Sequence, residues 1–169
     1  MGSERIRRAA AASRFALATI AIVAFPIAYP RTHEHFWVLV GYVALAIVFQ
    51  AMVVKNVGAS WRALVSGMVD VAIITFLVHL VGTVSTMLVA LYVYQATVNT
   101  LVSGRRVGVS CAVVAALAYT AVVVCEIAGI LPYAPDNPDG SVTPTATQHL
   151  AGASVVLATL VAATMLVEA

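Results

Sequence analysis

The stretch LVGTVSTMLVALYVYQATVNT, residues 80–100, decides the fold, because it joins an apolar run to evenly spaced polar side chains. Tyr92, Gln95 and Asn99 are three and four residues apart, which places them on one face of a helix. Polar groups inside a membrane are costly in lipid and therefore face the interior of a helical bundle. The spacing predicts a membrane helix that packs against other helices along this face.

The composition of the whole chain is that of a membrane protein. Of its 169 residues, 62% are hydrophobic and 9% are charged, and the mean hydropathy is +1.01. Soluble domains carry about 25% charged residues, so lipid is the expected solvent and the bilayer the main partner. The basic residues are too scattered to form a phosphate-binding patch, and we therefore expect no nucleic-acid partner.

Six stretches are long and apolar enough to cross a bilayer, which takes about 20 residues. They are residues 14–30, 36–54, 63–81, 84–103, 107–131 and 149–167. Turn-forming residues separate them, such as Pro30 after the first stretch and Gly82 after the third. The sequence predicts an all-α fold, a single domain over residues 1–169 built as an integral membrane bundle of six transmembrane helices.

The basic residues indicate how this multi-pass bundle is oriented. Eight of the nine lie before the first stretch or in the second and fourth loops: Arg5, Arg7, Arg8, Arg14, Lys55, Arg62, Arg105 and Arg106. Only Arg31 lies on the other side. Because cytoplasmic loops are enriched in Lys and Arg, we expect both termini in the cytoplasm.

The third stretch supplies a partner for the polar face of residues 92–99. Asp70 lies seven residues from the cytoplasmic end of its predicted helix, about 10 Å at 1.5 Å per residue. Gln95 lies about as deep in the neighbouring antiparallel helix, so we expect Asp70, Gln95 and Asn99 to form a hydrogen-bonded cluster, with Tyr92 on the same face. The cluster is either a switchable polar latch or proton site, or structural glue between helices.

A second polar group gathers on the extracytoplasmic side. His79 ends the third stretch, His149 begins the sixth, and Glu126 shares a face of the fifth with Tyr119. An intramembrane carboxylate is by default a functional candidate, and the alternative for Glu126 is a helix-end carboxylate that bonds the long loop. We regard Glu126, His79 and Tyr119, together with the Asp70 cluster, as the candidate signal-sensing or switch residues.

Histidine and carboxylate side chains are also ligands for zinc and similar ions. The residues that would form such a site are His33, His35, His79, Glu126 and His149. The segment "HEH" is not a recognised ligand motif, and loop histidines are more often solvated, so we expect no metal site. Histidines on this side could instead respond to external pH.

Small residues recur every four positions in the last two stretches. They are Gly104, Gly108, Ala112, Ala116 and Thr120 in the fifth, and Ser154, Ala158 and Ala162 in the sixth. Such ladders let helix backbones approach closely. They serve contacts within the bundle or between protomers, and the sequence leaves both uses open.

The motifs of common enzymes are missing from the sequence. It has no Gly-rich phosphate loop, no HExxH and no nucleophile elbow, and Cys111 and Cys125 are fourteen residues apart, outside metal or redox spacings. We therefore expect no catalytic residue and no cofactor. A transporter should show internal repeats, and none is evident; moreover, Asp70 and His79 lie on opposite sides of one helix and cannot line one path.

Four features of residues 69–133 stand out together: Asp70, the hairpin HLVGTVS (79–85), the basic turn Arg105-Arg106 and EIAGILP (126–132). On these features the segment resembles the six-helix N-terminal membrane sensor domain of bacterial histidine kinases, of the type that regulates type IV pilus expression. Thr83 replaces the second glycine of the family's hairpin, and Thr86-Met87 replaces its usual Pro-Phe. The specificity for a signal would differ if the hairpin shapes a binding site.

This resemblance implies a homodimeric sensing module of a two-component system in the bacterial cytoplasmic (inner) membrane. Its stimulus would be a membrane helix of a partner protein or a small apolar ligand, and its sixth helix would continue into a cytoplasmic histidine kinase or diguanylate cyclase. The sequence ends at MLVEA (165–169), so we expect that output domain to be absent from these residues. The alternatives are a small stand-alone transporter or ion-binding membrane protein, and a passive membrane anchor.

Overall fold

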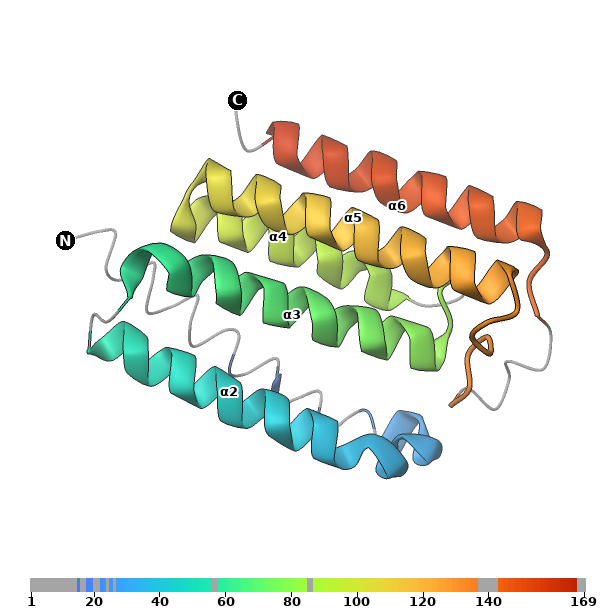
Figure 1. Cartoon of the computed structure of the whole chain (residues 1–169), viewed down its shortest axis with the longest axis horizontal. Coiled ribbons are helices and arrows are strands. Elements are labelled where there is room, and N and C mark those ends of the chain that lie inside the picture. Colours follow the sequence, from blue (N-terminus) through green and yellow to red (C-terminus); the bar gives the residue numbers. More distant parts are fainter. Residues whose placement is uncertain are drawn as a thin grey trace. The chain divides into compact units, whose positions relative to one another are not determined.

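The computed structural model describes residues 15, 18–19, 22–23, 25, 27–55, 58–84, 87–136 and 143–166. Within these residues the regular structure is helical, as the sequence predicts, with five α-helices and two 3-10 helices (Figure 1). They are η1 (Pro30–His35), α2 (Phe36–Val54), α3 (Ala59–Val81), η2 (Met87–Val89), α4 (Ala90–Ser103), α5 (Arg105–Ile127) and α6 (Ala146–Leu166). Ten residues of the predicted first span, residues 14–30, are among the described residues, and eight of these ten are α-helical.

The chain divides into two compact units, residues 1–66 and 67–169. In the first unit, α2 is followed by the start of α3, which begins at Ala59 rather than at the predicted residue 63. Arg62 is buried, and its Nη1 donates to the carbonyl oxygen of Met52 at 2.8 Å. The last carbonyls of a helix have no partner within the helix, so this guanidinium satisfies one of them at the end of α2.

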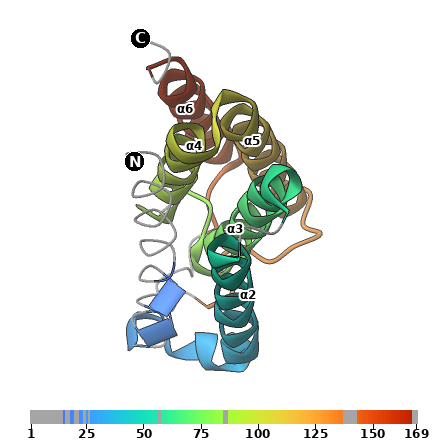
Figure 2. The same ribbon diagram turned by 90° about the vertical axis from the view of Figure 1, so that its left-hand side faces the viewer.

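In the second unit, α4, α5 and α6 pack against one another beside the remainder of α3 (Figures 1 and 2). A single residue, Gly104, connects α4 to α5. Its φ of 91° and ψ of 164° belong to a region that is essentially restricted to glycine. The α4–α5 hairpin therefore depends on glycine at this position.

Local capping signals end α5 earlier and begin α6 earlier than hydropathy predicts. The amide of Gly129, at φ 71°, donates to Glu126 and that of Ile130 to Cys125, the Schellman arrangement that closes a helix. Consequently α5 ends at Ile127, not at residue 131. Thr145 and Gln148 form a reciprocal capping box, so α6 begins at Ala146, not at residue 149.

Helix α4 is also shorter than the predicted span of residues 84–103. It begins at Ala90 and has 14 residues, since the chain first passes through a turn at residues 82–84 and then η2. Among the described residues, three helices are long and apolar enough to cross a membrane: His33–Val53, Trp61–Val81 and Arg105–Ile127. A shorter apolar helix covers Ala146–Ala162.

The second unit places polar side chains inside and large apolar side chains outside. Leu101 and Leu117 are both 66% exposed, whereas Asn99 is fully buried. This arrangement suits a lipid environment, where burial of apolar groups gives no advantage and polar groups must find partners in the bundle. The small-residue ladder of α5 serves this packing, because a Cβ at Gly108 would lie 2.7 Å from the Cα of Thr100 on α4.

Candidate functional site

The first polar cluster joins α3 to α4. The amide nitrogen of Gln95 donates a hydrogen bond to the Asp70 carboxylate, and both residues are buried. Asn99 lies one turn further along α4, and a Cβ at Gly67 would lie 3.0 Å from its Nδ2 and 2.5 Å from Sγ of Cys111. The contact between Asp70 and Gln95 that the depth argument predicts is therefore present, and Asn99 packs where α3, α4 and α5 meet.

Tyr92 forms a second link between α3 and α4. Its hydroxyl donates to Oγ1 of Thr75 at 2.7 Å, and Thr75 in turn donates to the carbonyl of Val71 at 2.8 Å. The edge of the Tyr92 ring contacts Tyr119 of α5, with ring centroids 6.0 Å apart. Such an edge-to-face pair adds about 0.5–1.5 kcal/mol beyond burial. Tyr92 and Tyr119 thus connect the Asp70 cluster to the residues around Glu126.

Glu126 is the centre of the third cluster, and its side chain has no exposed surface. Its Oε1 lies 3.0 Å from Nδ1 of His79 on α3, and its Oε2 accepts a hydrogen bond of 2.5 Å from the Thr83 hydroxyl. Nδ1 of His149, on α6, lies 3.8 Å from Oε2 and 3.5 Å from Oγ1 of Thr83. One carboxylate therefore connects α3, α5 and α6.

Two further contacts hold this cluster in place. The hydroxyl of Tyr119 donates to the carbonyl oxygen of Thr83 at 2.7 Å, which fixes the turn that presents the Thr83 hydroxyl to Glu126. The ring of Tyr133, in the segment after α5, packs edge-on against His149 with centroids 5.4 Å apart. Thr83 and His149, the two groups that face Oε2 of Glu126, are thus themselves held in place by aromatic side chains.

The hydrogen-bond directions follow from the carboxylate. An ionised carboxylate only accepts, so His79 presents a protonated Nδ1 to it and Thr83 donates its hydroxyl proton. The oxygen of Thr83 is then available to accept from His149. Among the described residues, the ion-pair partners of Glu126 are His79 and His149, neither of which is a permanent cation.

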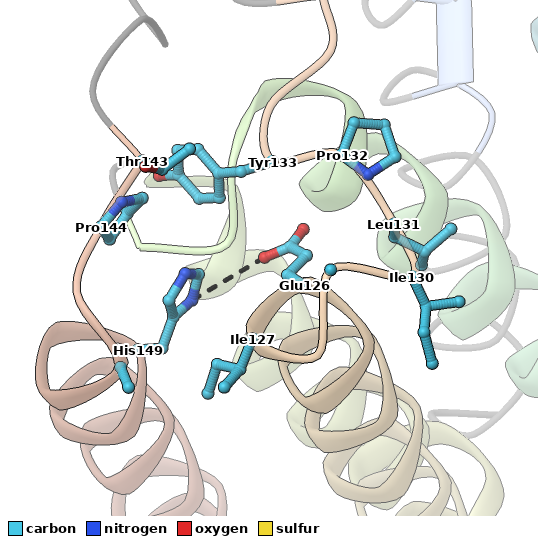
Figure 3. Close-up of a pocket in the computed structure, with 11 residues that line it drawn as sticks. Glu126, Ile127, Ile130, Leu131, Pro132, Tyr133, Thr143, Pro144 and His149 are labelled. Atoms are coloured by element: carbon cyan, nitrogen blue, oxygen red, sulfur yellow. Dashed lines mark ion pairs between the residues drawn. The ribbon is translucent and has the colours of Figure 1, made fainter.

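A cavity of about 580 Å³ opens beside Glu126, between the end of α5 and the start of α6 (Figure 3). Glu126, His149 and Thr143 are its polar lining residues, and apolar side chains form most of the remaining wall. That wall includes Ile127, Ile130, Leu131 and Pro144, with the ring of Tyr133. Its size lies within the range of about 300–1,000 Å³ found for small-molecule sites.

The family assignment agrees with this arrangement. A sequence model of the PilS-like transmembrane domain matches residues 3–167. The chain belongs to the PilS-like transmembrane domain family. No curated protein and no solved structure matches the chain. The resemblance to a six-helix membrane sensor domain is thereby confirmed, and the PilS-like domain is a membrane-embedded sensor module in contact with the lipid bilayer.

The residues that were considered as ligands of a metal ion do not form one ligand set in the described part of the chain. Within the described residues, no three His, Cys, Asp or Glu side chains are placed to hold one ion. His79, Glu126 and His149 do lie together, but through the contacts given above. His33 is exposed and His35 is half-buried, and both belong to the unit of residues 1–66.

Two threonines of the PilS-like domain were not foreseen as site residues. Thr83 appears in the sequence only as a departure from the family's hairpin, yet it is 1% exposed and bonds Glu126. Thr75 lies four residues before His79, on the same helix face, and this spacing could have identified it. The spacing of Thr83 carries no such signal, because it lies in a turn.

Proposed function

We propose that this chain is the signal-sensing and dimerisation module of a bacterial sensor kinase, which relays a membrane or extracytoplasmic stimulus to a cytoplasmic output domain. The observation that carries the proposal is the set of buried polar contacts that joins α3 to α4 through Asp70 and to α5 through Glu126. Simple packing in lipid needs no buried carboxylate, yet the carboxylates of Asp70 and Glu126 each have a hydrogen-bond partner on another helix. Contacts of this kind give a bundle two alternative, discrete arrangements.

A stimulus acts in this scheme by favouring one arrangement. It must make different contacts in the two states, since a ligand with equal affinity for both shifts nothing. A partner's membrane helix or a small apolar ligand would do so by entering between helices and replacing a contact such as that between Gln95 and Asp70. In this scheme the chemistry belongs to the output domain, a histidine kinase or diguanylate cyclase.

The orientation is part of the proposal. Arg105 and Arg106 begin α5 and Glu126 lies near its other end, a rise of about 30 Å at 1.5 Å per residue, which is the thickness of the bilayer's hydrocarbon core. Positively charged turns lie in the cytoplasm. This supports cytoplasmic termini in the cytoplasmic membrane and an extracytoplasmic location for the Glu126 cluster.

Dimerisation is supported by the outward face of α6. Its small residues Ser154, Ala158 and Ala162 are all exposed in the single chain, so this ladder is not used for packing within the described bundle. Small exposed residues permit close approach of a second helix in lipid. Joined through α6, two protomers would bring their cytoplasmic continuations together.

The test is a fusion of residues 1–169 to a histidine kinase core with a transcriptional reporter. Asp70→Ala should change the basal output about threefold to eighteenfold, because interhelical bonds in membranes contribute about 0.6 to 1.7 kcal/mol. Gln95→Ala should shift the output in the same direction, and the double variant no further than either alone. Thr97→Val serves as the control, because the Thr97 hydroxyl bonds only Val93 of its own helix.

Two results would contradict the proposal. One is unchanged basal and stimulated output in Asp70→Ala at a normal membrane level. The other is full retention of stimulated output when an unrelated six-helix dimer replaces residues 1–169, which is the behaviour of a passive anchor.

A further inference from the structure

The cavity beside Glu126 has a charge pattern that selects its occupant. Glu126 contributes a buried carboxylate, and its described partners are Thr83 and the two histidines, none of which is a permanent cation. The rest of the wall is mainly apolar and includes Leu131, Pro144 and the Tyr133 ring, with Thr143 as its polar member (Figure 3). An apolar chamber with one negative group attracts a cation that carries an apolar body.

The partners of the carboxylate differ in how firmly they hold it. Thr83 and His79 contact it at 2.5 and 3.0 Å, which are hydrogen-bond distances. His149 lies 3.8 Å from the carboxylate and 3.5 Å from the Thr83 oxygen, so it makes no short bond to either. His149 also lines the cavity. Of the three partners, His149 is therefore the one that an incoming group can replace at the smallest cost in free energy.

We propose that this cavity binds a small organic ammonium ion with a flat apolar body, and that the ammonium group reaches Glu126 by displacing the His149 ring. The ammonium forms a charge-assisted hydrogen bond to the carboxylate, which is about twice as strong as a neutral one. Tyr133 lines the same cavity and provides an aromatic face for the cation. Anionic ligands are disfavoured, since the described lining has no Lys or Arg to balance Glu126.

This binding site stands independently of the relay to an output domain, and its test uses the 169-residue chain alone. The chain is placed in nanodiscs of zwitterionic phosphatidylcholine, so that the lipid does not itself bind the amine. Isothermal titration calorimetry then compares tryptamine with its uncharged analogue 3-ethylindole and with the anion indole-3-propionate. Tryptamine should bind at least about tenfold more tightly than either, because a hydrogen bond to a charged group is at stake.

Variants distinguish the carboxylate from general electrostatic attraction. Glu126→Gln should weaken tryptamine binding at least about tenfold, whereas Glu34→Gln makes the same change at an exposed carboxylate outside the cavity and should leave binding unchanged. His149→Ala should bind tryptamine as tightly as the unaltered chain or more tightly, because the displaced ring is already absent. Equal binding of tryptamine and 3-ethylindole, or weaker binding in His149→Ala, would overturn the proposal.

A further variant keeps the test decisive if Glu126→Gln does not fold. Ala146 lines the cavity at the start of α6 and is exposed. Ala146→Trp fills the cavity without touching the bonds of Glu126, and folding is checked by far-UV circular dichroism. Loss of tryptamine binding in folded Ala146→Trp supports the proposal, and unchanged binding refutes it.

Discussion

Replacing Thr83 with valine removes the shortest hydrogen bond to Glu126 and leaves the shape of the side chain almost unchanged. Thr83 is 1% exposed and its hydroxyl donates to the carboxylate at 2.5 Å. A hydrogen bond to a charged group contributes about 1.5–3 kcal/mol. The Tyr119 bond to the Thr83 backbone is retained in the variant. We therefore expect Thr83→Val to lower the free energy of unfolding by about 1.5–3 kcal/mol.

Two further variants separate the lost bond from other effects. Thr83→Ser keeps the hydroxyl and loses only one methyl group, so its stability should stay closer to that of the unaltered chain than the stability of Thr83→Val does. Thr97→Val makes the same chemical change as Thr83→Val, but the Thr97 hydroxyl bonds only the Val93 carbonyl of its own helix at 2.8 Å. Thr97→Val should change the free energy of unfolding by no more than about 0.5 kcal/mol, as is usual for substitutions that disturb no buried hydrogen-bond network.

The assay is reversible unfolding of the purified chain in mixed micelles, driven by increasing sodium dodecyl sulfate and followed by far-UV circular dichroism. The free energies of the variants are compared at one detergent composition. The reasoning is refuted if Thr83→Val and Thr97→Val lower the stability equally. It is also refuted if Thr83→Ser is as unstable as Thr83→Val, since the hydroxyl is then irrelevant.

The same unfolding assay checks two more expectations. Gly108→Ala should lower the free energy of unfolding by up to about 2 kcal/mol. Its Cβ would lie 2.7 Å from the Thr100 Cα. Overpacking of this kind costs about 1–3 kcal/mol, and the higher helix propensity of alanine returns about 1 kcal/mol of that cost. Gly41→Ala has nothing within 4 Å and should be neutral or stabilising, and the opposite ranking would contradict the packing of α4 on α5. Tyr119→Phe loses the bond to the Thr83 carbonyl and should cost about 0.5–1.5 kcal/mol. Hydrogen exchange should accelerate at residues 82–84, and unchanged protection there would show that Tyr119 does not fix the turn.

Hydropathy was sufficient to predict that the described helices exist, and for one of them, α2, it predicted both ends. The predicted span of residues 36–54 coincides with α2. Hydropathy misplaced the end of α5, because Ile130 and Leu131 are apolar but follow Gly129, which has a left-handed backbone conformation. It misplaced the start of α6, because Thr145 and Gln148 are polar but begin a helix. These capping signals are present in the sequence and act through backbone hydrogen bonds that hydropathy does not register.

The start of α4 was also predicted wrongly, but for a different reason. The predicted span begins at residue 84, yet the described residues form a turn at Val84 and a 3-10 helix at Met87–Val89 before α4 begins at Ala90. The amide of Asp136 donates to the carbonyl of Leu80 at 2.9 Å, so the loop after α5 bonds the end of α3 beside this turn. Such a tertiary contact between distant segments cannot be derived from local propensity.

The candidate site was predictable where helix geometry alone determines the neighbours. Asp70 and Gln95 lie at matching depths of antiparallel helices, and Glu126, His79 and His149 lie at one end of three helices. The role of Thr83 was not predictable, because a threonine in an apolar segment most often bonds its own helix. Its hydroxyl reaches Glu126 only through the turn that follows α3.

The one-residue connection at Gly104 has a mechanical consequence. Helices joined by a long loop can slide past each other, but α4 and α5 share a joint of one residue and pack together on either side of it. Helix α5 is about 33 Å long at 1.5 Å per residue, with Gly104 just before its first residue and Glu126 near its other end. A rotation of α5 by about two degrees about Gly104 would therefore displace the Glu126 carboxylate by about 1 Å. A small change of backbone angle at this one residue is thus enough to lengthen the hydrogen bonds of Glu126 at the opposite end of the bundle.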